Sequence, residues 1–239
     1  MKIEKLKGAK VALLGLGVSQ IDFVIGAENS KEWDEVWGIN SVCGVFNCDR
    51  VFMMDPPSRF FDTEDAGKQT KVLRRILPDL SVPVYTCELD DRVPSAELYP
   101  LEEVCNHTKS AYFNNTVAYA IAFAFYNEVD TLELYGIDFS YSNNMHLAEA
   151  GRACVEFWCA KTMDGGMKIG VSPRSGLLDA NVPITERLYG YHRLEDPYVA
   201  VPLEDKWVIE KNSKINEVLK EENMSLIKEP PKPPEPYKG

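Results

Sequence analysis

The sequence has no run of 18 or more apolar residues, so it contains no segment that could span a membrane as a helix. Its first ten residues, MKIEKLKGAK, carry lysines but no apolar stretch of the kind that a secretion signal needs. Basic residues are in the minority: 26 Lys and Arg stand against 37 Asp and Glu, for a formal net charge of −11. Such a charge disfavours a broad nucleic-acid-binding surface. We therefore expect a cytoplasmic protein that does not bind membranes.

Cysteine occurs six times but never as a Cys-x-x-Cys pair, and most of the six lie in apolar runs. In a reducing compartment such thiols are more often small core residues than disulfides or zinc ligands. The acidic segment ELDD at 88–91 does not have the spacing of an Asp-x-Asp metal motif. We therefore predict neither a bound metal nor a cofactor.

Three familiar nucleotide and nucleophile motifs are missing as well. The turn GLGVSQ at 15–20 begins like a dinucleotide fingerprint, but Gln20 replaces the third glycine. The expected second strand ends in Asn40, where a dinucleotide site needs an acidic residue. Neither GxxxxGK[ST] nor Gly-x-Ser-x-Gly occurs. These absences argue against an NAD enzyme, a P-loop ATPase or kinase, and an ordinary α/β-hydrolase.

What is present is an alternation of short apolar runs with helical patterns. With 45% hydrophobic and 26% charged residues among 239, the composition fits one globular domain. We predict strands at 10–14, 35–39, 50–54, 82–86, 131–137 and 167–171, and helices at 19–27, 64–77, 117–126 and 147–163. Ser19 is expected to cap the first helix, and 87–111 is expected to be irregular. Alternating strands and helices predict an α/β fold: a Rossmann-like, mostly parallel sheet with helices on both faces.

The chain divides at about residue 184. We assign 1–184 to the Rossmann-like domain and 185–239 to a C-terminal extension. The extension is expected to hold one polar amphipathic helix at 204–224 and a disordered, proline-rich tail, EPPKPPEPYKG. The segment 203–227 can dock on its own chain or on a second copy, and its sequence leaves a homodimer open.

Polar residues follow several of the expected strands. Ligands of an open parallel sheet bind outside the carboxyl ends of its strands, near the point where the strand order reverses. The residues expected there are Gly15, Gly17, Ser19, Asn40, Asp55 and Asp138, with Asn115 and Thr116 at a helix start. Glycines allow close backbone approach and helix-start amides attract anions, although such a turn can also simply join a strand to a helix.

Three further residues could take part in chemistry. His146 lies in a polar loop eight residues after Asp138, and histidine suits proton transfer near neutral pH; it can equally be a surface residue that caps a helix. Arg152 can clamp a phosphate or form a salt-bridge ladder with Glu149 and Glu156. Tyr141 can donate its hydroxyl to a leaving phosphate or simply be a loop aromatic.

Four of these segments together resemble a known family. GLGVS at 15–19, WGIN at 37–40, NNT at 114–116 and ELYGIDFSY at 133–141 are similar in order and spacing to motifs of bacterial sialyltransferases of the Campylobacter type. The family counterparts are a Gly-Asn-Gly-Pro-Ser turn, a Cys-Asn, a Thr-Ser-Gly helix start and a Gly-Ile-Asp-Phe strand end. The resemblance covers roughly residues 9–175. WGIN, YGIDF and LYGY at 188–191 also resemble stretches of a group of uncharacterised phage proteins.

The resemblance implies that domain 1–184 binds a nucleotide sugar. Carried over motif by motif, the nucleotide would be held by Gly15, Gly17, Ser19, Asn40, Asn115 and Thr116. Tyr141 lies near, but not at, the position of a family tyrosine that stabilises the departing phosphate, and Ser140 stands where a tyrosine is expected. His146 lies earlier than the family's histidine base, and Leu16 and Val18 replace the Asn and Pro of the turn. These departures leave the sugar undefined.

We therefore expect a metal-independent glycosyltransferase that moves a sugar from a nucleotide sugar to an acceptor hydroxyl. His146 or Asp138 would deprotonate the acceptor, while helix-start amides and Arg152 offset the phosphate charge. If the chain is phage-encoded, a hydroxymethylated pyrimidine in DNA is one candidate acceptor. Its groove would use Lys68, Lys71, Arg74 and Arg75, which otherwise form a solvated helix face. Two other interpretations are a non-catalytic nucleotide- or sugar-phosphate-binding protein and a transferase like the pterin pyrophosphokinases.

Overall fold

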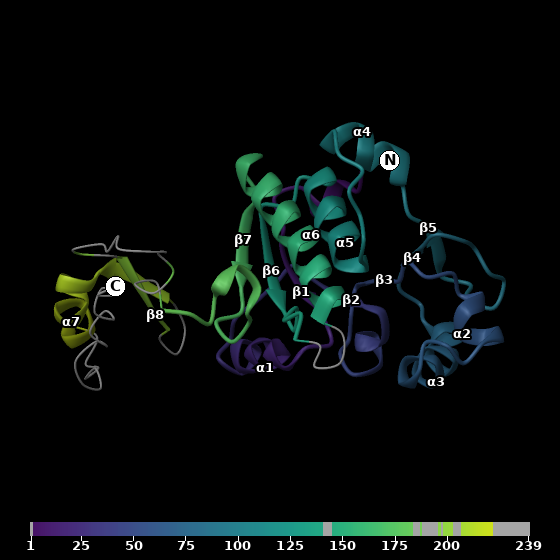
Figure 1. Ribbon diagram of the computed structural model, residues 1–239, viewed down its shortest axis with the longest axis horizontal. Coiled ribbons are helices and arrows are strands. Elements are labelled where there is room, and N and C mark those ends of the chain that lie inside the picture. The colour runs from purple at the N-terminus through teal and green to yellow at the C-terminus, as the bar shows by residue number, and fades with distance from the viewer. Residues whose placement is uncertain are drawn as a thin grey trace, which may run out of the picture.

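The computed structural model describes residues 2–140, 145–183, 187, 196, 198–202 and 207–221. Its centre is a seven-stranded sheet in the order β5-β4-β3-β2-β1-β6-β7, in which all neighbours are parallel. The strands are β1 (Lys10–Leu14), β2 (Glu35–Ile39), β3 (Arg50–Phe52), β4 (Val84–Thr86), β5 (Ala96–Leu98), β6 (Thr131–Tyr135) and β7 (Lys168–Val171). The predicted Rossmann-like, parallel α/β fold is confirmed (Figure 1).

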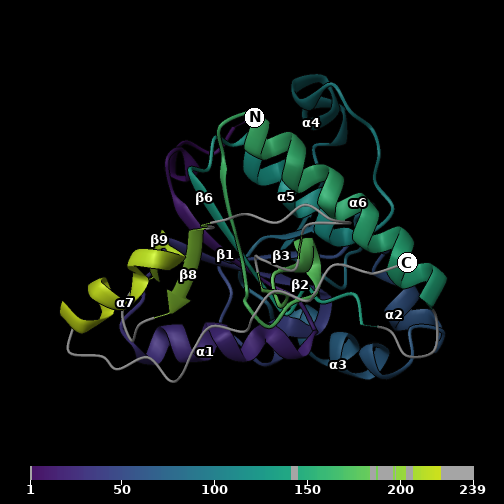
Figure 2. The same ribbon diagram turned by 60° about the vertical axis from the view of Figure 1, so that its left-hand side comes forward.

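Helices cover both faces of the sheet, as predicted (Figures 1 and 2). They are α1 (Ile21–Glu28), α2 (Ser58–Asp62), α3 (Lys68–Ile76), α4 (Leu101–Thr108), α5 (Thr116–Tyr126) and α6 (Met145–Asp164). Alternate residues of β1 show how this works: Val11 and Leu13 pack with residues of α4, α5 and α6, whereas Ala12 and Leu14 pack on the α1 side. Strands buried on both faces need apolar residues on both, which Val11 to Leu14 supply, whereas Lys10 at the start of β1 is only partly buried.

Short 3₁₀ helices fill several connections: η1 (Glu4–Leu6), η2 (Val18–Gln20), η3 (Asn40–Gly44), η4 (Leu77–Asp79) and η5 (Leu177–Asp179). Two of them, η2 and η3, directly follow the carboxyl ends of β1 and β2, so they shape the edge where a ligand is expected. In the described part of the chain, no helix is long and apolar enough to cross a membrane.

The expectation for residues 87–111 is wrong. This segment contains edge strand β5 and helix α4, because its backbone pairs with β4 and because Val104 is fully buried against the main core. Within the predicted strand 82–86, β4 begins at Val84, directly after Pro83. The carbonyl of Pro83 accepts a hydrogen bond from the N–H of Val51.

The C-terminal extension also differs from its prediction. An antiparallel hairpin of β8 (Tyr198–Pro202) and β9 (Trp207–Lys211) precedes α7 (Asn212–Glu221), so the helix expected from residue 204 begins later. Ile215 and Leu219 of α7 are buried, and Figure 1 draws this unit beside the sheet. The proline-rich tail and the LYGY stretch lie outside the described residues.

Candidate functional site

The segments singled out by the sequence lie at one edge of the sheet. Because β1, β2, β3 and β6 are parallel, the residues that follow them, Gly15, Asn40, Asp55 and Asp138, share its carboxyl edge. Helices α5 and α6 also begin there, since α5 leads into β6 and α6 follows it. The strand order reverses at β1, which lies between β2 and β6, so Asn40 and Asp138 follow strands about 10 Å apart on either side of the turn after β1. This is the place where an open α/β sheet binds ligands.

The turns after β1 and β6 are joined to each other by hydrogen bonds. The backbone N–H groups of Gly15 and Gly17 donate to the carbonyls of Tyr135 and Gly136, each at 2.7 Å. The N–H of Ser19 donates to Asp138 Oδ2 at 2.9 Å. The amides of three turn residues are therefore used inside the protein, and their contact with a nucleotide stays a prediction.

Ser19 links the same two turns through its side chain, and it is fully buried. Its hydroxyl donates to Asp138 Oδ1 and accepts from the N–H of Gly136 at 2.9 Å. The expectation that Ser19 caps the first helix is therefore wrong: α1 begins at Ile21, and the hydroxyl is engaged with residues more than 100 positions away. Both carboxylate oxygens of Asp138 accept hydrogen bonds from Ser19, so Asp138 joins the turn after β6 to the turn after β1.

The close approach of the two turns explains the glycines. A Cβ on Gly15 would lie 2.4 Å from the carbonyl oxygen of Gly136, and one on Gly17 would lie 2.4 Å from Asp138 Oδ2. No side chain fits at either distance. Gly136 itself has φ +67°, a conformation that L side chains rarely adopt. The glycine pattern is therefore required by packing of the turn after β1 on the turn after β6.

Asn40 differs from its neighbours at this edge because part of its side chain lacks a partner. Its Oδ1 is buried and has no hydrogen-bond partner within the described residues. The residue also has φ +51°, in the left-handed region, directly after β2. An unpaired buried acceptor costs about 1–3 kcal/mol. The hydroxyl oxygens of Thr70 and Ser95 are also buried without a partner among the described residues, and Asn40 is distinguished from them by its place directly after β2, at the carboxyl edge. A ligand that donates a hydrogen bond would satisfy this oxygen.

The starts of α5 and α6 are held together by two asparagines. Asn115 caps α5, accepting from the N–H of Ala118 at 3.1 Å, and its Nδ2 donates to the carbonyl of Gly151 at 3.2 Å. Asn114 donates to the carbonyl of Ala150 at 2.9 Å. His146 is exposed and precedes Ala150 by one helical turn, so this contact brings it near the N-terminus of α5. Thr116, the first residue of α5, is half-buried beside them.

Asp55 and Arg152 are both paired. Asp55 accepts from Arg59 at 2.5 Å, and Arg59 also bonds Asp65 at 3.1 Å. Arg152 donates to Glu156 at 2.7 Å, one of the two partners of the predicted salt-bridge ladder, and its second partner is Asp179 at 2.8 Å in place of the predicted Glu149. These hydrogen bonds raise the pKa of the Arg152 guanidinium. Tyr141 lies outside the residues that the structure describes.

Two serines after β7 complete the edge and were missed in the sequence. Ser172 and Ser175 are buried, and their hydroxyls donate to Asp22 of α1 and to the carbonyl of Ile137, the latter at 2.8 Å. Arg174, between them, forms an ion pair with Asp22. The available signal was the polar run SPRS after an expected strand, the same criterion that singled out Asn40.

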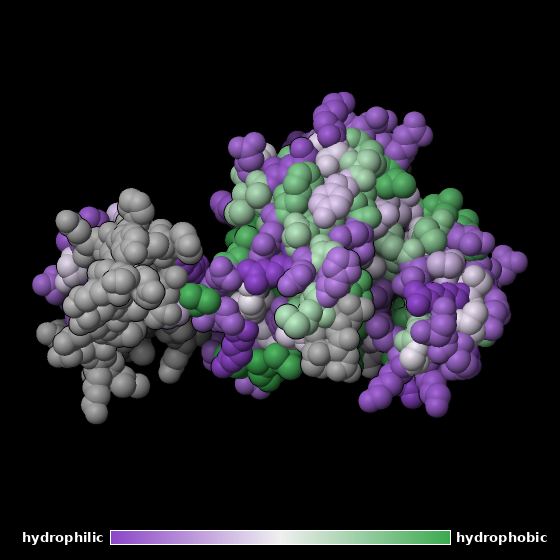
Figure 3. All heavy atoms as spheres, in the orientation of Figure 1, coloured by the Kyte–Doolittle hydropathy of each residue, from purple (hydrophilic) through white to green (hydrophobic). Residues whose placement is uncertain are grey.

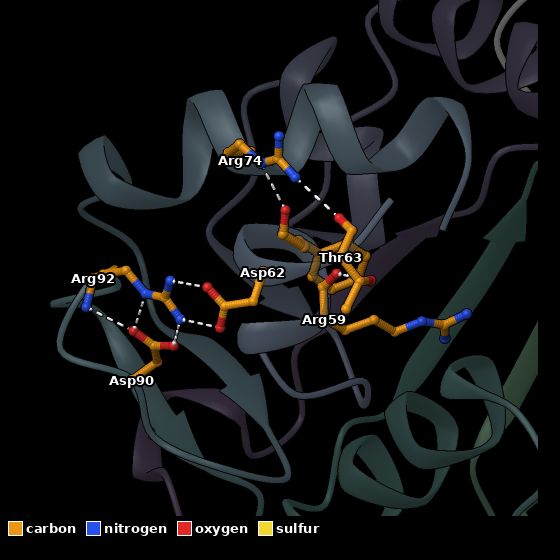
Figure 4. A network of polar contacts seen from close by, with 7 residues as sticks. Arg59, Asp62, Thr63, Arg74, Asp90 and Arg92 are labelled. Atoms are coloured by element: carbon orange, nitrogen blue, oxygen red, sulfur yellow. Dashed lines mark hydrogen bonds and ion pairs between the residues drawn. The ribbon is translucent and has the colours of Figure 1, made fainter. Parts of the chain in front are cut away.

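Ionic contacts and hydrogen bonds also join α2 to α3 and to the segment around Arg92, close to Asp55. Figure 4 shows Arg92 between Asp62 and Asp90, and Arg74 beside Thr63. The Arg92 side chain bonds Asp62 at 2.6 and 2.9 Å and Asp90 at 2.7 and 2.8 Å. In the described part of the chain, no three His, Cys, Asp or Glu side chains are grouped so as to hold a metal ion.

Comparison with known proteins gives the following. No protein-family model matches the chain, and no curated protein matches it. The solved structure of the sialyltransferase CstII from Campylobacter jejuni with cytidine-5'-monophosphate is 19% identical, with a TM-score of 0.44, covering 72% of this chain and 83% of that one. An α-2,3-sialyltransferase from Campylobacter jejuni in apo form is 16% identical, with a TM-score of 0.43 and coverages of 74% and 82%. These are sialyltransferases of the type whose motifs the sequence resembles.

Proposed function

We propose that this protein is a glycosyltransferase that moves a sugar from a nucleotide sugar to an acceptor hydroxyl. The observation that carries the proposal is the buried Oδ1 of Asn40, which has no partner in the part of the chain that the structure describes and lies where the strand order of a parallel sheet reverses. The order of the motifs GLGVS, WGIN, NNT and YGIDF supports a nucleotide sugar as the ligand. The buried oxygen requires a donor, which a nucleobase amino group or a ribose hydroxyl supplies.

In this proposal the sugar–phosphate bond of the donor breaks as the acceptor oxygen bonds to the sugar carbon. His146 takes the proton of the acceptor hydroxyl, and the N-terminus of α5 at Thr116 offsets the charge on the departing phosphate. Asp138 acts by holding the turns after β1 and β6. Arg152 can reach the phosphate only by exchanging Glu156 or Asp179 for it. We propose that the transfer needs no metal ion.

As the acceptor we propose a hydroxyl group on DNA. Bases within a DNA strand carry no alcohol hydroxyl unless they are modified, so a hydroxymethylated pyrimidine would be the acceptor base. The support for DNA is a row of exposed cations on α3, next to the segment that begins with Asn40.

A non-catalytic nucleotide-binding protein is the second candidate. It is favoured by the engagement of Asp138 and Arg152 in contacts within the protein, which leaves His146 as the main group for chemistry. Hydrolysis of CMP- and UDP-sugars separates the two candidates. His146→Gln should lower hydrolysis at least 100-fold if this residue transfers the proton, while nucleotide binding is retained. Absence of hydrolysis alongside clear binding would favour the binder, and magnesium-dependent consumption of ATP would indicate a pyrophosphokinase-like transferase.

The test of the site itself is a thermal-shift panel of nucleotides and nucleotide sugars. CMP is the first to include, because solved sialyltransferase structures hold it. A ligand at 100 times its dissociation constant should stabilise the protein by about 2.7 kcal/mol. Asn40→Gly should weaken binding about tenfold, because one hydrogen bond is lost.

Asn40→Gly is a clean variant because glycine readily adopts its backbone conformation, at φ +51°. Lys109→Gly is the matched control, since Lys109 has φ +54° and ends α4, away from Asn40. The control should bind the nucleotide as the wild type does. Equal binding by wild type and Asn40→Gly, or no thermal shift with any nucleotide, would contradict the proposal.

A further inference from the structure

Helix α3 has two opposite faces of different character. Thr70 and Leu73, with Leu77 just beyond the helix, are completely buried against the sheet. Three basic residues, Lys68, Lys71 and Arg75, are exposed. Each of them lies two positions before one of the buried residues. At 100° per residue this displacement is about half a turn, so the three cations form a row along the outer face.

The charges of this row are uncompensated, unlike those of the neighbouring arginines. Arg74, on the same helix, donates to the carbonyls of Phe60 and Thr63 at 2.8 and 3.0 Å (Figure 4). It also pairs with Glu64 at 2.8 Å. Among the residues that the structure describes, no carboxylate lies within 4.0 Å of the cationic nitrogens of the row, whose members are Lys68, Lys71 and Arg75. In a chain of net charge −11, such a row is a local exception.

The row lies beside the candidate site. The Ser41 hydroxyl donates to Gln69 Oε1 at 3.4 Å, which links α3 to η3, the segment that begins with Asn40. Further along, a Cβ on Gly44 would touch Val72 at 3.1 Å, so the helix and η3 pack closely. A partner held on α3 would therefore extend toward the carboxyl edge of the sheet.

We propose that the outer face of α3 docks the phosphodiester backbone of double-stranded DNA. That the DNA is the acceptor rests on the proposed function. A rise of 1.5 Å per residue puts the three cations within about 10.5 Å, or one charge every 5 Å, which suits a continuous polyanion. The surface over α2 and α3 is mainly hydrophilic in Figure 3, and no large apolar side chain of α3 is exposed, which disfavours a membrane.

The test measures binding of a fluorescein-labelled 20-base-pair DNA duplex to the full chain by fluorescence polarisation at several salt concentrations. The triple variant Lys68→Gln/Lys71→Gln/Arg75→Gln should bind at least tenfold more weakly at 50 mM salt. The slope of log affinity against log salt should be smaller by about 2.7, because three phosphate contacts are lost. Unmodified DNA suffices, since the contact is to the backbone.

The control is Lys109→Gln/Lys161→Gln/Lys168→Gln, which changes the net charge equally but lies directly after α4, in α6 and in β7. It should keep the wild-type affinity within twofold. The proposal is overturned by a wild type that binds no DNA, by equal losses in the two triple variants, or by preferential binding to vesicles of anionic phospholipid. Failure of the nucleotide panel, by contrast, would overturn the proposed function and leave DNA docking to be judged on its own measurements.

Discussion

The two edges of the seven-stranded sheet use polar side chains in opposite ways. At the amino edge, Glu35 accepts two hydrogen bonds from Arg50, at 2.8 and 3.1 Å, and one from Trp37 at 2.7 Å, and it pairs with Lys5 at 2.6 Å. Arg50 also donates to the hydroxyl of Tyr85 at 3.1 Å. Every ionic group of this buried cluster has a partner. At the carboxyl edge, Asn40 keeps a buried oxygen that no described residue satisfies.

The contrast suggests that the polar cluster at the amino edge stabilises the fold, whereas Asn40 at the carboxyl edge serves to bind a ligand. Burial alone would raise the pKa of Glu35, but the hydrogen bonds from Arg50, Lys5 and Trp37 outweigh it and lower that pKa. The cluster therefore holds its charges without a ligand, and its role is structural. The carboxyl edge holds together through Ser19 and Asp138, yet it leaves Asn40 for something outside the chain. The four predictions below test this division, from the largest expected loss of stability to the smallest.

The largest effect is expected at the amino edge. Arg50→Met should lower the free energy of unfolding by about 3–5 kcal/mol, because it leaves the Glu35 carboxylate buried with fewer partners. The double variant Glu35→Leu/Arg50→Met should recover much of that loss, since no unpaired charge remains. Urea unfolding followed by circular dichroism measures both. A loss below 1 kcal/mol in the single variant would show that Lys5 and Trp37 suffice for Glu35.

A second effect is expected where the turns after β1 and β6 touch. Gly15→Ala should cost about 1–3 kcal/mol, because its Cβ would meet a backbone oxygen that cannot move aside. Gly176→Ala is the control: its Cβ would lie 3.8 Å from the carbonyl oxygen of Asp138, an ordinary contact. Thermal and urea unfolding of the pair are compared. Equal stability of the two variants would mean that the turns can separate freely.

Ser19→Ala should have a smaller effect of about 1–2 kcal/mol. It leaves the N–H of Gly136 and one oxygen of Asp138 without their shared partner. If Asp138 serves only to hold the turns, nucleotide affinity and stability should fall together in this variant. Asn40→Gly should instead lose affinity while keeping stability. Measuring unfolding and nucleotide binding on both variants tests the division directly, and the same pattern in the two would refute it.

The smallest effect is expected at the exposed Arg92 cluster. The hydrogen bonds from the Arg92 side chain and backbone lower the pKa of Asp90 from 3.8 to about 2. A lowered carboxyl pKa stabilises the fold above pH 4, and that contribution is lost as pH falls toward 2. Arg92→Gln should therefore lower the unfolding temperature slightly at pH 7 and less at pH 2. Arg75→Gln, which removes an unpaired cation, should show no such difference; a similar pH dependence in both would point to net charge.

Much of the sheet could be predicted from sequence because its strands are short apolar runs. The bounds of β1 and β2 agree with the prediction, and α5 begins one residue before the expected run, at a predicted cap. β5 was missed because CELDDRVPSAELYP at 87–100 has no clear periodicity and its order comes from pairing with β4. The helix α4, which follows it, was included in the same irregular segment. In the extension, β9 was read as the start of a helix, whereas it pairs with β8 in a local antiparallel hairpin.

For the site, the sequence by itself determined most of the polar residues at the carboxyl edge, because in a parallel sheet the residues that follow each strand all lie at that edge, whatever the strand order. Only the tertiary structure decided which of these polar groups form hydrogen bonds within the protein. Whether a hydroxyl, amide or carboxylate is satisfied depends on groups brought within about 3 Å by folding, over separations such as that between Ser19 and Asp138. That proximity engages Ser19, Asp138 and Arg152, and it leaves Asn40 with a buried oxygen that no residue of the described ranges satisfies.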